Sequence, residues 1–199
     1  MQVTEMDALA GARFDTDPWR HLYLANSLPA GFATTLARTF PAERLAPSAR
    51  SGSAKDYRLW TADVTDAAGL PDPWGDFLGA LGGSAHRDLL ARLSGVDLSG
   101  TRVSLTVWEY RGGDFLAPHV DKADKVLTQI VYLGEHWAEG DGGRLFIQRT
   151  PDPDDVVSRL SPALGATAVL VRSDHSWHSV EMSRPGAAPR RSLNLTYWS

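Results

Sequence analysis

The spacing of apolar residues predicts helices in two segments of the first hundred residues. Residues 29–40 and 73–93 repeat apolar side chains at helix-like intervals, and Pro29 is suited to the start of the first helix. In the second segment, Gly82 and Gly83 weaken the middle. Between the two segments, polar residues 50–56 (RSGSAKD) predict a loop, and residues 57–64 (YRLWTADV) predict a strand.

From residue 101 onward the helical spacing gives way to short strands separated by Gly, Pro and Asp. The predicted strands are 102–110, 115–121, 125–133, 143–149, 156–161, 166–172, 177–182 and 190–198. This series of short strands predicts an α+β, mainly β fold, a double-stranded β-helix or jelly roll, with the N-terminal helices packed on one sheet.

Alternation within two of these strands assigns their faces. In the strand 125–133, one face carries Val126, Thr128, Ile130 and Tyr132, and the other carries Leu127, Gln129, Val131 and Leu133. In the strand 190–198, one face carries Arg190, Ser192, Asn194, Thr196 and Trp198, and the other carries Arg191, Leu193, Leu195 and Tyr197. We expect the more polar face of the last strand to line a cavity and the apolar face to meet the helices.

Composition narrows the class of protein. A chain of 199 residues that is 43% hydrophobic is long enough for one good core. We expect a single domain over 1–199, with 1–100 as a support region of helices and strand and 101–199 as the jelly-roll core. A formal net charge of −4 disfavours nucleic acid as a partner. Without an apolar leader or a long apolar run, we expect a cytoplasmic protein that does not enter a membrane.

The absence of cysteine means that any metal must be held by nitrogen and oxygen. His119 and Asp121 flank Val120 at the end of a predicted strand, so both side chains leave the same face. His178 follows in the segment SDHSWHSV, where a distant strand could bring it alongside. Two histidines and one carboxylate are the ligands of a facial triad for non-haem iron, which leaves coordination positions open.

The order of motifs over 101–199 resembles the prolyl-hydroxylase-like branch of the 2-oxoglutarate and Fe(II)-dependent oxygenases. The segments are YRGGDFLAPHVDKADKVLTQIVYLGEHWAEGDGGRLFI, PALGATAVLVRSD, WHSV and RRSLNLTYW. The resemblance implies His119, Asp121 and His178 as catalytic iron ligands. It selects His178 over His175, because the family's ligand stands directly before the positions of Ser179 and Val180. It also implies Fe(II), 2-oxoglutarate as co-substrate and O2, with ascorbate as a candidate reductant.

The resemblance further implies a basic residue on the last strand that binds the distal carboxylate of 2-oxoglutarate. Arg190 shares a face with Ser192, which together form the arrangement seen in related oxygenases, and face assignment favours Arg190 over Arg191. Arg191 stays open as the alternative, because the segment 185–189 makes the spacing after His178 unusual. Tyr110 and Tyr132 match family positions that line the co-substrate pocket, although both could be core aromatics.

The expected activity is hydroxylation of an unactivated carbon, with release of succinate and CO2. Related halogenases lack the carboxylate ligand that Asp121 supplies here, whereas desaturation and ring formation would use the same residues. The expected substrate is a small amino-acid-like molecule or a carrier-bound or peptide-bound residue, with Arg111, Arg144 and Arg172 as candidates to meet a substrate carboxylate. The competing hypotheses are a non-catalytic jelly-roll binding protein and a cupin-like metalloenzyme that does not use 2-oxoglutarate. The oligomeric state is left open.

Overall fold

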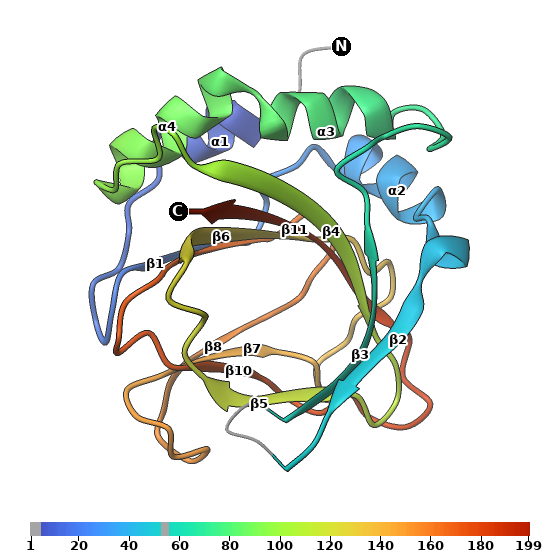
Figure 1. Ribbon diagram of the computed structural model, residues 1–199. Helices are drawn as coiled ribbons and strands as arrows, with labels where there is room; N and C mark the ends of the chain where they lie inside the picture. Colours follow the sequence, from blue (N-terminus) through green and yellow to red (C-terminus); the bar gives the residue numbers. More distant parts are fainter. Residues whose placement is uncertain (1–4, 53–55) are drawn as a thin grey trace.

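The computed structural model describes residues 5–52 and 56–199 (Figure 1). The helices are α1 (Glu5–Ala10), α2 (Ala30–Arg38), the 3-10 turn η1 (Ala42–Arg44), α3 (Trp74–Gly82) and α4 (Ser84–Ser94). The strands are β1 (His21–Leu24), β2 (Ala46–Arg50), β3 (Tyr57–Asp63), β4 (Arg102–Tyr110), β5 (Phe115–His119), β6 (Lys125–Tyr132), β7 (Leu145–Gln148), β8 (Val156–Leu160), β9 (Thr167–Val171), β10 (His178–Val180) and β11 (Arg190–Trp198).

The described strands form one antiparallel sheet that curls into a nearly closed, jelly-roll-like barrel. Their order is β1-β9-β6-β11-β4-β3-β5-β10-β7-β8, and β2 pairs with β3. In Figure 1, β6, β11 and β4 form the wall beneath the helices, and β5, β7, β8 and β10 form the opposite wall. The predicted fold class is therefore confirmed.

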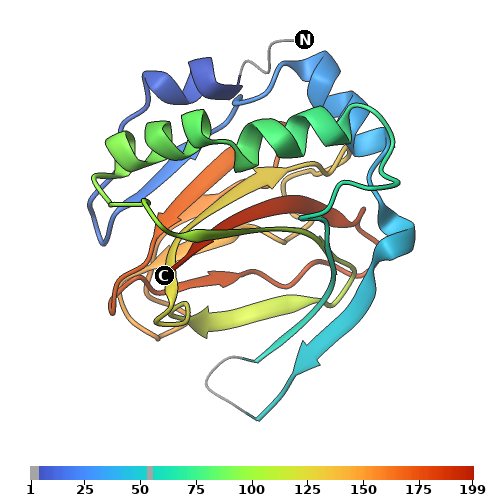
Figure 2. The same cartoon turned by 45° about the horizontal axis from the view of Figure 1, so that its top comes forward.

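The helices cover one outer face of the barrel, as Figure 2 shows from a second direction. They are amphipathic: α3 buries Trp74, Phe77, Leu78 and Leu81, and α2 buries Ala33, Leu36 and Ala37. All of these side chains except Ala37 belong to one hydrophobic cluster with the apolar face of β11, which contributes Leu193, Leu195 and Tyr197. Burial of apolar surface between the two layers thus fixes which face of β11 turns toward the helices.

A second hydrophobic cluster lies inside the barrel. It includes Tyr110 of β4, Ile130 and Tyr132 of β6, and Ile147 of β7. Leu127 and Val131 of β6 belong instead to the cluster beneath the helices. The alternation predicted for β11 therefore assigns its two faces correctly, and that for β6 is correct from Leu127 to Tyr132. It is wrong for Val126, which packs against the cluster beneath the helices because the pairing with β11 is irregular at the start of β6.

The structure corrects three expectations about the first hundred residues. The segment 73–93 forms two helices, because Gly83 adopts an extended backbone (φ −74°, ψ 162°) between α3 and α4. Strands β1 and β2 were not predicted, and the predicted loop 50–56 begins inside β2 at Arg50. Residues 53–55 of that loop lie outside the described residues. Within the described ranges, no helix is long and apolar enough to cross a membrane.

Candidate metal centre and co-substrate pocket

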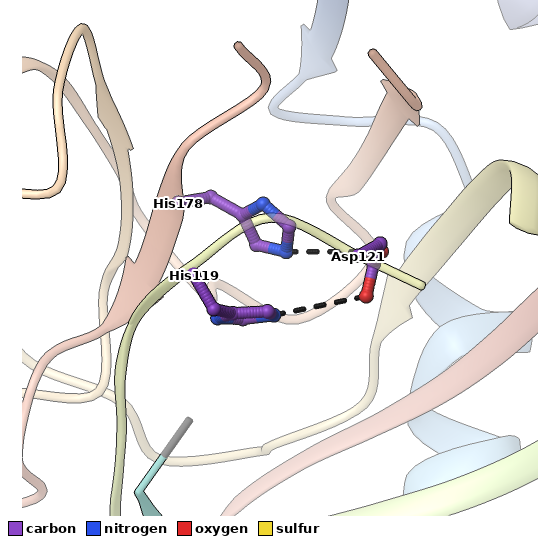
Figure 3. A group of neighbouring side chains, drawn as sticks. All are labelled: His119, Asp121 and His178. Atoms are coloured by element: carbon purple, nitrogen blue, oxygen red, sulfur yellow. Dashed lines mark ion pairs between the residues drawn. The ribbon is translucent and has the colours of Figure 1, made fainter. Parts of the chain in front are cut away.

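Two strands bring His119 and His178 together. His119 ends β5, His178 begins β10, and the two residues are direct partners in this antiparallel pair. Their ring centroids lie 4.2 Å apart. Asp121 follows β5. Its Oδ1 lies 3.7 Å from His119 Nε2, and its Oδ2 lies 3.9 Å from His178 Nε2 (Figure 3). One ligand atom from each of the three buried residues lies within 4.8 Å of the others, so one ion can contact all three.

Backbone carbonyl groups orient both imidazole rings. His119 Nδ1 lies 2.9 Å from the Ala117 carbonyl oxygen, and His178 Nδ1 lies 2.9 Å from the Ser176 carbonyl oxygen. Since a carbonyl only accepts, each Nδ1 carries the proton and donates it, which leaves the Nε2 lone pair to face the carboxylate. This arrangement is the usual support for metal-binding histidines.

Two further side chains hold the triad in place. Lys125 Nζ lies 2.9 Å from Asp121 Oδ1, so the ammonium group orients the carboxylate from the start of β6. The Trp19 ring lies 6.1 Å from the His178 ring, and Trp19 Nε1 donates to the backbone carbonyls of Gln148 and Trp177. The triad is therefore fixed by an ion pair on one side and by a packed indole on the other.

Beside the triad, Arg190 lies in a buried pocket with two tyrosines. Its guanidinium carbon is 4.7 Å from the Tyr110 ring centroid and 5.0 Å from that of Tyr132. Arg190 is 5% exposed, and among the described residues it has no carboxylate partner. A buried cation without a counter-ion is costly, so the pocket is suited to an anion that enters from outside.

The hydroxyl groups of this pocket point to the same conclusion. Within the described part of the chain, Arg190 Nε and the hydroxyls of Tyr110, Tyr132 and Thr128 have no hydrogen-bond partner. Burial raises the pKa of both tyrosines, and the nearby Arg190 opposes that rise. The phenols thus stay protonated and can donate. One guanidinium and two phenol donors fit a carboxylate, and Arg190 and Tyr110 line the cavity that also contains the triad.

The other two residues predicted to bind the co-substrate, Arg191 and Ser192, lie on opposite faces of β11. Arg191 faces the other way, where its Nε lies 2.8 Å from Glu109 Oε2 and its guanidinium lies over the Phe40 ring. Ser192 lies on the Arg190 face and is fully buried, and its hydroxyl donates to Asn194 Oδ1 at 3.0 Å. Asn194 itself lines the cavity. The structure thus brings Arg190, and not Arg191, to the triad.

The other singled-out side chains lie outside the triad. His175 and His136 are exposed. Arg111 pairs with Glu109, Arg144 with Glu139, and Arg172 with Asp174. None of the three arginines lines the cavity that contains the triad.

Sequence reasoning missed several residues of the cavity. Lys125, Thr128 and Asn194 line it together with Trp108. Thr128 and Asn194 stand on the inward faces that alternation assigns, so a search of those faces for polar side chains would have found them. Lys125 gave no such signal, because its contact with Asp121 depends on the turn between β5 and β6.

Comparisons with known proteins agree with this geometry. A family model of the 2OG-Fe(II) oxygenase superfamily matches residues 102–198, about half of the chain. A prolyl-4-hydroxylase from Pseudomonas putida superposes with a TM-score of 0.68 at 22% identity, over 97% of this chain and 96% of that one. A Trichoplax adhaerens prolyl hydroxylase, solved with a hypoxia inducible factor peptide fragment, gives 0.66 at 17% identity, over 98% and 87%.

Of two other matches, one extends over nearly the whole fold and the other over a short segment of sequence. The epimerase SnoN from nogalamycin biosynthesis gives a TM-score of 0.59 at 17% identity, over 98% of this chain and 83% of that one. A 7-cyano-7-deazaguanine synthase from Chlorobium phaeovibrioides is 37% identical over 59 residues, which are 30% of this chain. The chain covers only 26% of that curated relative, so this match carries no functional argument.

The family model and the fold therefore agree on one class of protein. The solved structures share the barrel at low identity, and the family model covers the strands that hold the triad. The donor set of two imidazoles and one carboxylate fits iron(II), and the unpaired Arg190 pocket fits 2-oxoglutarate. The chain belongs to the 2OG-Fe(II) oxygenase superfamily, the iron-dependent dioxygenases that use 2-oxoglutarate and O2.

Proposed function

We propose that this protein hydroxylates an unactivated carbon of a small amino-acid-like substrate or of a carrier-bound or peptide-bound residue. The same turnover consumes 2-oxoglutarate and O2, of which one oxygen atom enters the new hydroxyl group and the other enters succinate, and it releases CO2. The observation that carries the proposal is the buried triad of His119, Asp121 and His178 beside a buried arginine without a counter-ion. The triad suits a redox metal, and the arginine suits a dicarboxylate bound next to that metal.

His119 Nε2, His178 Nε2 and one Asp121 oxygen are the proposed iron ligands. The two Nδ1–H groups keep their bonds to the Ala117 and Ser176 carbonyls, so both rings are oriented before the metal binds. Lys125 occupies Asp121 Oδ1, which supports coordination through Oδ2. When bound, iron(II) and 2-oxoglutarate supply the oxygen activation, and the protein supplies position and shelter from water.

Arg190 is the proposed group that holds the distal carboxylate of 2-oxoglutarate. Tyr110 and Tyr132 donate to the same carboxylate through hydroxyls that burial keeps protonated. The Ser192 hydroxyl donates a hydrogen bond to Asn194 Oδ1, so Ser192 positions Asn194, which lines the cavity. Glu109 already binds Arg191 on the opposite face of β11, which supports the assignment of this role to Arg190.

The triad also bears on the outcome of the reaction. Asp121 fills the third ligand position with a carboxylate, which supports hydroxylation over halogenation. We also propose that residues 1–199 work as one domain, with 101–199 as the catalytic core. Two contacts support this: β3 pairs with both β4 and β5, and Trp19 packs on His178.

The test is release of succinate from 2-oxoglutarate by the iron-loaded protein, with a panel of amino acids and their carrier-bound forms. Asp121→Ala is expected to abolish release, because two ligands alone hold iron poorly. His175→Ala is the matched control, since His175 is exposed and stands three positions from His178. Undiminished release by Asp121→Ala, or equal loss in the control, would contradict the proposal.

A further inference from the structure

A second cavity opens next to the triad and is larger than the first. It has a volume of about 290 Å³ and is lined by alternate residues of four strands that turn the same face inward. These are Ser48 and Arg50 of β2, Tyr57, Leu59 and Thr61 of β3, Ser104, Thr106 and Trp108 of β4, and Thr196 and Trp198 of β11, with Leu116, Lys122 and Lys125. We call it the outer chamber. Its size is near the low end for small-molecule sites, which span roughly 300–1,000 Å³.

The outer chamber leads directly to the proposed iron site. Trp108, Leu116 and Lys125 line both cavities. Lys125 marks the junction, because its ammonium group binds Asp121 and also lies 5.5 Å from the Trp198 ring centroid. A molecule in the outer chamber therefore places one end beside Trp108 and Leu116, next to the triad.

Aromatic rings in fixed positions form much of the chamber wall. Trp108 Nε1 donates to Thr106 Oγ1 at 2.9 Å, and Trp198 Nε1 donates to Ser104 Oγ at 2.8 Å. Each indole thus satisfies its own polar group within the wall. The Trp198 ring also contacts Arg102 and Lys125, at 5.4 and 5.5 Å from its centroid, and both indoles still line the chamber. Together with Tyr57 and Leu59, these rings favour a flat or cyclic apolar body.

The charges of the chamber have one sign. Arg50, Lys122 and Lys125 line it, and none of its described lining residues is a carboxylate. Arg50 and Lys122 are exposed, so they lie toward solvent, whereas the half-buried Lys125 lies at the triad. The protein as a whole is acidic, with a net charge of −4, so this local excess of cations is a property of the chamber. Cations of one sign in a cleft attract an anionic ligand.

We propose that the outer chamber binds the oxidised substrate, and that this substrate is a small organic anion with an aromatic or cyclic apolar body. The anionic group, a carboxylate or a phosphate, meets Arg50 and Lys122 near the mouth. The apolar body packs against Trp198 and Trp108 and presents its carbon to the triad. This inference rests on the proposed function, and it replaces a broad substrate class with one defined by charge and shape.

The test measures binding to the protein loaded with Fe(II) and 2-oxoglutarate under nitrogen. The probes are 3-phenylpropanoate, phenethyl phosphate, the neutral 3-phenylpropanamide, the non-aromatic hexanoate and a neutral proline-containing tripeptide amide. Calorimetry gives the affinities, and tryptophan fluorescence reports contact with the chamber wall. We expect both aromatic anions to bind more tightly than the amide, the hexanoate and the peptide. The aromatic anion with the higher affinity identifies the anionic group of the substrate as a carboxylate or a phosphate.

Paired variants test the cations. The double substitution Arg50→Gln/Lys122→Gln is expected to weaken 3-phenylpropanoate binding about threefold to tenfold, the effect of two exposed charge contacts, and to leave the amide unchanged. Both residues are exposed, so the variant should fold. Arg92→Gln is the control, since it removes an exposed cation from α4 in the helix layer. Trp198→Leu should weaken binding of both aromatic anions while hexanoate binding stays constant.

The outcomes separate this inference from the proposed function. Equal affinity for anion and amide, or tightest binding by the peptide, would overturn the inference although the protein still binds Fe(II) and 2-oxoglutarate. An unchanged affinity in the double variant would also overturn it. Failure of the protein to form a complex with Fe(II) and 2-oxoglutarate is a separate result, seen before any probe is added, and counts against the proposed function.

Discussion

Arg190 and Tyr110 are direct partners across the antiparallel pair β11–β4, and the Arg190 guanidinium carbon lies 4.7 Å from the centre of the Tyr110 ring. The next pair in the register is Arg191 with Glu109, whose side chains meet on the opposite face of the sheet at 2.8 Å. Two adjacent arginines thus differ in their counter-ion. One has a carboxylate from the protein, and the other is placed to receive one from a ligand.

The adjacent arginines give a matched pair of variants. Arg190→Gln is expected to raise the concentration of 2-oxoglutarate needed for half-saturation by about 100-fold or more, since losing one partner of a buried charge pair costs about 3–5 kcal/mol. Arg191→Gln should leave this concentration almost unchanged and lower the free energy of unfolding, because Glu109 loses one of its two arginine partners. Equal effects on 2-oxoglutarate binding, measured by titration, would contradict the assignment of Arg190.

Gly143 limits how Arg190 can be packed. Its φ is +72°, and a Cβ at this position would lie 3.1 Å from Arg190 Cδ. Gly143→Ala should therefore cost about 1–2 kcal/mol of stability through backbone strain and also weaken 2-oxoglutarate binding by displacing Arg190. Gly140→Ala is the control, because Gly140 has φ +95° but a Cβ added there would meet no atom within 4 Å.

Chemical denaturation and 2-oxoglutarate titration separate the two effects of the glycine variants. Both variants should lose stability, and only Gly143→Ala should bind 2-oxoglutarate more weakly. If both variants keep the wild-type affinity for 2-oxoglutarate, the packing of Gly143 does not position Arg190.

The sequence predicted the regular parts of this fold because burial imposes a repeat on them. β4 and β11 were predicted with their observed bounds, and alternation placed Arg190 and Arg191 on opposite faces. The strands β1 and β2 could not be predicted in the same way. β1 has only four residues, and β2 (APSAR) is a mostly exposed edge strand without alternation. Backbone pairing with β9 and β3 forms them, which a local pattern does not record.

The residues of the site likewise fall into those that a local sequence pattern could predict and those that it could not. His119 and Asp121 could be paired locally because one residue separates them in an extended chain. The choice of His178 over His175 required a resemblance, and the structure places only His178 opposite His119. The Lys125 contact with Asp121 and the shared walls of the two cavities depend on three-dimensional packing alone.

His86 links stability to pH through the helix layer. It is buried in α4, where its Nε2 lies 2.7 Å from Gln129 Oε1, and burial lowers its pKa from the ordinary value of 6.5 although the Gln129 contact opposes this. At a pH well above 6.5 the ring is neutral in both the folded and the unfolded states. As the pH falls below 6.5 the unfolded state takes up the proton first, so stability is lost on acidification.

The variant His86→Gln is therefore expected to reduce the acid sensitivity of the free energy of unfolding. Between about pH 7.5 and about pH 5.5, wild type should lose up to about 1.4 kcal/mol more than the variant. Urea denaturation at both pH values measures the difference. Arg92→Gln, which changes an exposed position of the same helix and no histidine, should keep the wild-type slope. A variant with a slope as steep as that of wild type would show that His86 does not contribute.

The most direct test of the central claim is a spectroscopic titration of the Fe(II)-loaded protein with 2-oxoglutarate under nitrogen. If His119, Asp121 and His178 hold iron next to Arg190, wild type develops the visible absorption band of an Fe(II)–2-oxoglutarate chelate. His119→Ala should fail to develop it, and Arg190→Gln should need far more 2-oxoglutarate. A folded wild-type protein that binds no iron, or that shows no such band at saturating 2-oxoglutarate, would contradict the account.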